Sequence, residues 1–99
     1  MKKETQLQIE LSEEVADGTY ANLAVIAHST SEFVFDFVRM MPGVAKAKVK
    51  SRIVMTPEHA KRLLAALQDN IMKYETQFGE INVPELGGYA PTPMFKGEA

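Results

Sequence analysis

The sequence predicts an α+β fold, in which a four-stranded antiparallel meander sheet is followed by one long C-terminal helix in the order ββββα. Up to residue 55, apolar and polar residues tend to alternate with a period of two, which is typical of strands. From residue 57, apolar residues recur at spacings of three and four, which is typical of a helix. The connections between the predicted strands are short, and short connections favour an antiparallel meander.

Three segments predict the first three strands. Residues 6–11 alternate strictly between polar and apolar side chains. Residues 20–28 are apolar almost throughout, which predicts a strand covered on both faces, although their alanines leave a short helix open. Residues 33–38 give the clearest strand pattern, with one face formed by Phe33, Phe35 and Phe37.

The fourth predicted strand spans residues 44–55 and runs into the helix. Its alternation would place Lys46, Lys48, Lys50 and Arg52 on one face. Thr56 is a favourable N-cap and Pro57 suits the first helical position. A helix over residues 57–78 would be about 33 Å long. We expect it to cover the phenylalanine face and, because of its length, to extend beyond the edge of the sheet. Its apolar stripe comprises Ala60, Leu63, Leu64, Leu67, Ile71, Tyr74 and Phe78.

Composition favours one soluble domain over residues 1–83, with a Pro/Gly-rich tail over residues 84–99 that we expect to be extended or disordered. The chain has 99 residues and no cysteine, so a reducing compartment such as the cytoplasm is expected. It lacks the ~18 consecutive apolar residues of a membrane span. The net charge of −2 is unevenly distributed, since residues 39–62 carry seven bases against one acid.

Apolar surface left over by this fold predicts self-association. Val34 and Val38 would lie on the sheet face that the helix does not cover. Ile71, Tyr74 and Phe78 would lie where the helix overhangs. Because contiguous exposed apolar patches usually mark interfaces, we expect a homodimer or higher homo-oligomer through these five residues.

The sequence offers little support for an enzyme. It contains no phosphate-binding loop or dinucleotide fingerprint, and neither His28 nor His59 has a metal-binding spacing, so no cofactor is expected. Asp36 interrupts an apolar strand. It is interpreted either as a buried acid with a shifted pKa or, with better support, as the cross-strand partner of Arg39, Arg52 or a lysine.

The basic strand is the best candidate for a binding surface. Alternate residues of a strand lie about 6.6 Å apart, close to the phosphate repeat of an extended single strand. A polyanion site would therefore comprise Arg39, Lys46, Lys48, Lys50 and Arg52. Two structural alternatives stay open: lysines also guard edge strands against aggregation, and these could pair with Glu10 and Asp36.

The segments FVFDF, SRIVMTPEHAKRLLAAL and NIMKYETQFGEI together resemble a family of small bacterial and archaeal proteins known as DUF3467. The resemblance covers most of residues 5–82. It implies no catalytic residues, because the family has no settled function. It is compatible with an accessory role in transcription or translation.

These observations give two hypotheses for the function. The first is a non-enzymatic homo-oligomeric binding module whose basic strand contacts single-stranded nucleic acid or an acidic protein. The alternative is a chaperone or scaffold oligomer, similar to the SecB-like export chaperones, that presents an apolar sheet groove. Salt should distinguish them, since charge-driven binding weakens as salt rises.

Overall fold

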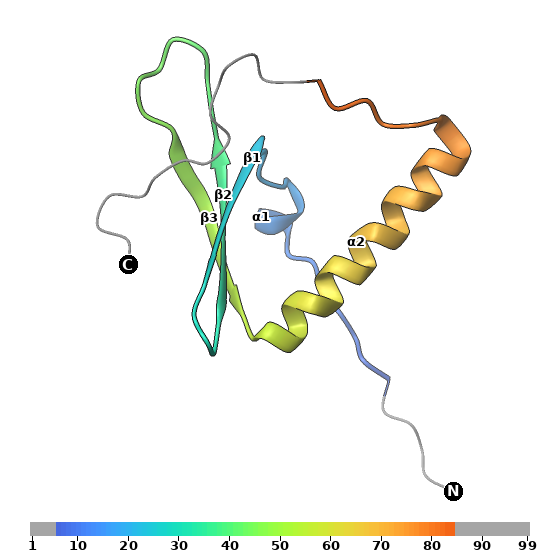
Figure 1. Ribbon diagram of the computed structural model, residues 1–99. Coiled ribbons are helices and arrows are strands. Elements are labelled where there is room, and N and C mark those ends of the chain that lie inside the picture. The colour runs from blue at the N-terminus through green and yellow to red at the C-terminus, as the bar shows by residue number, and fades with distance from the viewer. Residues whose placement is uncertain (1–5, 85–99) are drawn as a thin grey trace, which may run out of the picture.

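The computed structural model describes residues 6–84 and shows an α+β fold with an antiparallel sheet and a long C-terminal helix (Figure 1). The tail predicted from residue 84 onward lies, apart from that residue, outside the described part of the chain. The elements in chain order are α1 (Glu13–Ala16), β1 (Leu23–His28), β2 (Phe33–Arg39), β3 (Lys48–Met55) and α2 (Pro57–Phe78).

The sheet is a three-stranded meander in which β2 lies between β1 and β3. Both pairs are antiparallel, as predicted. Phe35 at the centre of β2 lies opposite Ile26 of β1 and Ile53 of β3. We call the face that carries Phe33, Phe35 and Phe37 the aromatic face.

The prediction of four strands is wrong, because residues 6–11, the first predicted strand, form no strand. Leu7 and Ile9 are more than four-fifths exposed to solvent. Alternation states which side chains would share a face, but a strand also needs a neighbour for its backbone groups. Within residues 6–84, no strand pairs with the outer edge of β1 or of β3. The segment instead leads into the short helix α1, whose N-cap Ser12 accepts a hydrogen bond from the Val15 amide.

Two of the three remaining predicted strands begin later than expected. The strand predicted from residue 20 is β1, which starts at Leu23. Just before it, the Asn22 side chain bridges to the backbone of Met40, accepting from its N–H at 2.8 Å and donating to its carbonyl at 3.0 Å. These two hydrogen bonds close the β1–β2 ladder at the end where β1 begins and β2 ends. The strand predicted from residue 44 is β3. It starts at Lys48, because residues 40–47 form the turn between β2 and β3.

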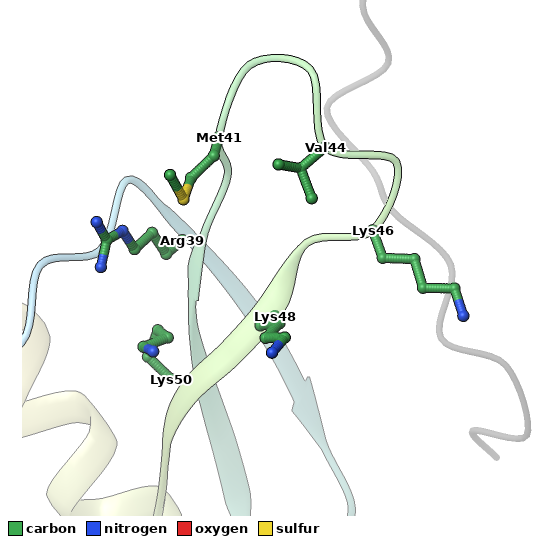
Figure 2. Close-up of a pocket in the computed structure, with 6 residues that line it drawn as sticks. All are labelled: Arg39, Met41, Val44, Lys46, Lys48 and Lys50. Atoms are coloured by element: carbon green, nitrogen blue, oxygen red, sulfur yellow. The ribbon is translucent and has the colours of Figure 1, made fainter.

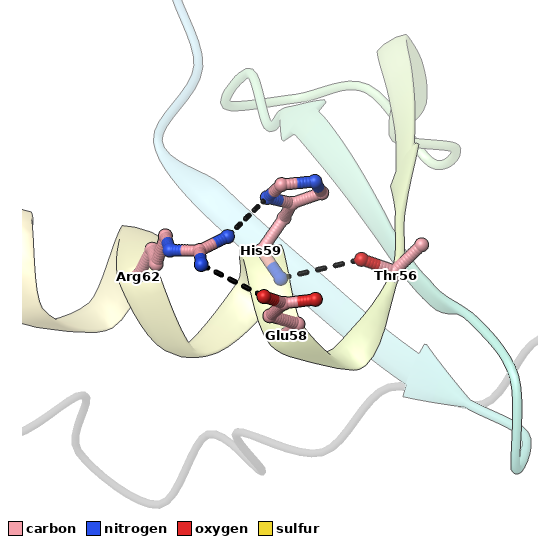
Figure 3. A network of polar contacts seen from close by, with 4 residues as sticks. All are labelled: Thr56, Glu58, His59 and Arg62. Atoms are coloured by element: carbon pink, nitrogen blue, oxygen red, sulfur yellow. Dashed lines mark hydrogen bonds and ion pairs between the residues drawn. The ribbon is translucent and has the colours of Figure 1, made fainter.

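Helix α2 has the predicted bounds, and local signals fix both of its ends. Thr56 accepts a hydrogen bond from the His59 amide at 3.3 Å, which satisfies one free donor of the first turn (Figure 3). Glu58 and Arg62 form an ion pair at 2.7 Å, and Arg62 also contacts Nδ1 of His59 (Figure 3). At the other end, Gly79 adopts a positive φ of 101°, which suits glycine.

The helix lies on the aromatic side of the sheet but packs loosely against it. It begins beside the last residue of β3 and slopes away from the strands along its length (Figure 1). None of its 22 residues is buried. Among the described residues, the buried apolar side chains are Phe35 and Val38 alone. The predicted cover of the phenylalanine face is therefore only partial, and an open space separates the sheet from the helix.

Candidate basic site and apolar wedge

Four cationic side chains gather around the turn between β2 and β3. Arg39 ends β2, Lys46 lies in the turn, and Lys48 and Lys50 belong to β3. Together with Met41 and Val44 they line a shallow pocket of about 220 Å³ (Figure 2). Figure 2 shows Lys46 pointing away from the other three cations. We call Arg39, Lys46, Lys48 and Lys50 the basic cluster.

A β-bulge decides which basic residues share this site. Val49 lies opposite Val38 and Ser51 opposite Phe37, so Lys50 is an extra residue without a counterpart in β2. One extra residue inverts the facing of every side chain beyond it. As a result Lys48, opposite Arg39, lies on the aromatic face, whereas Arg52 lies on the opposite face with Asp36. The prediction that Arg52 shares a face with Lys48 is wrong.

Arg52 is instead the partner of Asp36. Its Nε and one terminal nitrogen donate to the two carboxylate oxygens of Asp36 at 2.7 and 2.8 Å. The Asp36 side chain is 2% exposed and the Arg52 side chain is 55% exposed. These hydrogen bonds hold the pKa of Asp36 below its ordinary value, although burial acts in the opposite direction. The structure thus pairs Asp36 with one of the partners that the sequence suggested.

The basic cluster, in contrast, keeps its charges available. Each of its four residues is exposed, and none of the described residues that line the pocket is acidic. None of the ion pairs found within residues 6–84 involves a member of the cluster. The arrangement can supply several donors and positive charges to phosphate or carboxylate groups. Sequence reasoning missed Met41 and Val44, and their position in the turn between two basic segments was the signal that could have revealed them.

A second feature is the apolar space between α2 and the aromatic face, which we call the apolar wedge. Its volume is about 390 Å³. The sheet contributes Ile26, Phe33 and Phe35 to its lining, and the first half of α2 contributes Ala60, Lys61, Leu63, Leu64 and Leu67. Five of these apolar side chains form an exposed or half-buried surface that the rest of residues 6–84 does not cover: Ile26, Phe33, Leu63, Leu64 and Leu67.

The five predicted interface residues fall into two groups. Ile71, Tyr74 and Phe78 lie on the second half of α2 and are between 40% and 65% exposed. The Tyr74 and Phe78 rings contact one another, with centroids 4.9 Å apart. Val34 and Val38 lie on the sheet face opposite to the aromatic one, where Val38 is already buried within the chain. The structure therefore does not bring the two groups together.

The remaining candidates show ordinary local contacts. His28 stacks on Phe33 with ring centroids 5.2 Å apart, and His59 lies in the first turn of α2. Within residues 6–84, no group of three or more His, Cys, Asp or Glu side chains is placed to hold a metal ion. None of the helices in the same residues is long and apolar enough to cross a membrane.

Comparison with known proteins identified one family. A family model described as "Protein of unknown function (DUF3467)" matches residues 1–83. No curated protein and no solved structure matches the chain.

Proposed function

This chain belongs to the DUF3467 family, and from its basic cluster we propose that it is a small, non-enzymatic, homo-oligomeric module that binds single-stranded nucleic acid. The cluster would contact the phosphate backbone, in an accessory role in transcription or translation. An acidic protein is the competing partner, and it is distinguished by the experiment below. The absence of cysteine supports a reducing compartment such as the cytoplasm.

The observation that carries this proposal is the concentration around one turn of four cations that form no ion pair within residues 6–84. Arg39 and Lys48 lie opposite one another in β2 and β3, and Lys50 is the bulge residue between two paired residues of β3, so the sheet sets the backbone positions of all three. Lys46 extends the positive surface beyond the strands (Figure 2). A fixed group of this kind binds a polyanion by neutralising phosphates and releasing counterions.

The net charge of −2 does not oppose this proposal, because the charge is segregated along the chain. Residues 39–62 carry seven bases against a single acid, whereas residues 1–38 carry two bases against seven acids. Local potential at a site, rather than net charge, steers a charged partner within a Debye length of about 10 Å at 0.1 M salt. The apolar Met41 and Val44 beside the cations offer contact area for bases or sugars.

Fluorescence anisotropy of labelled single-stranded DNA and RNA tests the proposal. We expect saturable binding at low salt that weakens steeply as salt rises. A labelled acidic peptide of similar charge density is the competitor. If the peptide binds and both nucleic acids do not, the partner is an acidic protein and the nucleic-acid proposal fails.

The apolar wedge favours a second candidate, a chaperone or scaffold that receives an unfolded or partner chain. Its lining is almost entirely apolar, and Lys61 is the one charged residue among the described residues that form it. Binding there would depend on apolar burial and would respond little to salt. Suppression of the aggregation of an unfolded client protein, unchanged between low and physiological salt, would support this candidate over the first.

A further inference from the structure

We propose that the occupant of the apolar wedge is α2 of a second copy of this chain, paired antiparallel with the first α2 along its apolar stripe. This inference deepens the homo-oligomeric part of the proposed function and does not depend on the basic cluster. Four observations support it: the spacing of the stripe, the sizes of the side chains along it, two charges beside it, and the shape of the wedge.

The spacing of the stripe is that of a helix-pairing seam. Its central residues recur at alternating intervals of four and three over the whole helix: Ala60, Leu64, Leu67, Ile71, Tyr74 and Phe78. This 3.5-residue period is the one that keeps a seam directed at a partner helix. Every member of the seam is at least partly exposed in the single chain, so the seam is free to pair.

Antiparallel pairing matches large side chains with small ones. With the two helices fully overlapped, Ala60 of one copy faces Phe78 of the other, and Leu64 faces Tyr74. Leu67 and Ile71 then face one another at the centre. Parallel pairing would instead place Phe78 against Phe78 and Ala60 against Ala60, leaving one end crowded and the other hollow, and both defects are destabilising.

The charges beside the seam favour the same orientation. Lys61 and Glu75 flank the seam on the same side. Lys61 lies within one turn of the first seam residue and Glu75 within one turn of the last, and Gln68 lies midway between them. In the antiparallel pair, Lys61 of each copy faces Glu75 of the other, which gives two symmetric ion pairs. In a parallel pair, equivalent positions lie on opposite sides of the seam, so neither Lys61 nor Glu75 would face a charge of opposite sign. No ion pair in the described chain uses either side chain, and the Glu75 carboxylate accepts one hydrogen bond, from the Ile81 amide at 3.0 Å, which leaves further acceptor sites on its oxygens.

The wedge lies where the second copy's aromatic residues would enter. Ala60, Leu64 and Leu67 line it, and the antiparallel register sets Phe78, Tyr74 and Ile71 of the second copy opposite them. The 390 Å³ of the wedge exceeds the roughly 150 Å³ in which an apolar cavity accepts benzene, so it has room for about two rings. Phe33 and Phe35 on the sheet provide aromatic contacts for those rings.

Charge exchange at positions 61 and 75 tests this pairing. Sedimentation equilibrium should give the wild-type chain twice its monomer mass of 11.0 kDa. Lys61→Glu and Glu75→Lys each create two like-charge contacts and should raise the dimer Kd about tenfold. The double variant Lys61→Glu/Glu75→Lys restores both pairs and should return the Kd to within about threefold of wild type. Rescue by the double variant also excludes misfolding as the cause of the single effects.

Lys73→Glu is the matched control, because it makes the same charge change on the other side of α2, where Lys73 pairs with Asp69. It should leave the dimer Kd unchanged. A chain that stays monomeric, or an assembly of any size that is indifferent to both exchanges, would overturn the inference. Failure of nucleic-acid binding would not, since the basic cluster takes no part in the helix pair.

The orientation of the pair has its own test, which the absence of native cysteine makes simple. Lys61→Cys and Glu75→Cys variants are treated with a short bismaleimide, separately and as a mixture. Antiparallel pairing predicts cross-linked dimers in the mixture alone. Cross-linking of either variant with itself, or no cross-linked dimer in the mixture, would contradict the antiparallel register and overturn the inference.

Discussion

Arg52 covers Asp36 with two parallel hydrogen bonds across neighbouring strands, at 2.7 and 2.8 Å. This contact gives the buried carboxylate its compensating charge and removes Arg52 from the basic cluster. It forms because the bulge at Lys50 moves Arg52 to the face on which Asp36 lies. The pair therefore links the stability of the sheet to the composition of the candidate binding site.

Loss of Arg52 should destabilise the fold. Arg52→Gln leaves Asp36 charged and buried without its cationic partner, and we expect a loss of about 2 kcal/mol in the free energy of unfolding. Urea denaturation followed by circular dichroism measures this loss. Arg39→Gln, a matched change on the same sheet, should alter stability by no more than about 0.5 kcal/mol. Equal effects of the two substitutions would contradict the assigned role of Arg52.

The same pair predicts a specific response to acid. The pKa of Asp36 is lower in the folded chain than its ordinary value of 3.8, so the folded state favours the ionised form. Its contribution to stability is complete above about pH 4 and is lost as the pH falls from there through the folded pKa. Stability curves between pH 6 and about pH 2 should thus decline less steeply for Asp36→Asn than for wild type. The exposed Asp69→Asn variant serves as control and should follow the wild-type slope.

Residues 6–11 should contribute little to the stability of the sheet. Ile9 is 85% exposed and belongs to no strand. Ile9→Ser should therefore change the free energy of unfolding by less than about 0.5 kcal/mol. A core strand position would instead lose about 2 kcal/mol or more. A loss of that size, measured by urea denaturation at a fixed chain concentration, would mean that this segment pairs with a sheet edge in solution.

Removal of charges from the basic cluster should lower the affinity for nucleic acid. Lys46→Gln, Lys48→Gln and Lys50→Gln combined should weaken single-stranded DNA binding and reduce the salt slope by about 2, since each phosphate contact contributes about 0.7. Arg52→Gln, measured at a temperature at which the variant is still folded, should leave the salt slope of DNA binding unchanged. If Arg52→Gln has the larger effect, the binding surface lies on the opposite face of the sheet.

Much of the fold was predictable because the signals were local. Thr56, Pro57 and Gly79 mark the ends of α2 through capping, a fixed φ and a positive φ, and each effect acts within one turn. Phe33, Phe35 and Phe37 share one face because of strand geometry alone, and the helix does lie on that side. The antiparallel order followed from short connections.

The errors concern non-local relationships. Alternation in residues 6–11 could not reveal that no strand of the described part of the chain pairs with them. The bulge at Lys50 depends on how β3 pairs with β2, and a regular lysine alternation carries no sign of it. The site was accordingly predicted in part, since four of its five proposed residues gather around one turn and the fifth binds Asp36.

The salt dependence of single-stranded nucleic-acid binding tests the central claim most directly. Four exposed cations contacting phosphates predict a slope of about −3 in a plot of log Kobs against log salt, from about 0.7 per contact. The protein and labelled DNA or RNA are titrated by anisotropy between low and physiological salt. A slope near that value would support the basic cluster as a working surface. Absence of binding at low salt, or binding indifferent to salt, would contradict the claim.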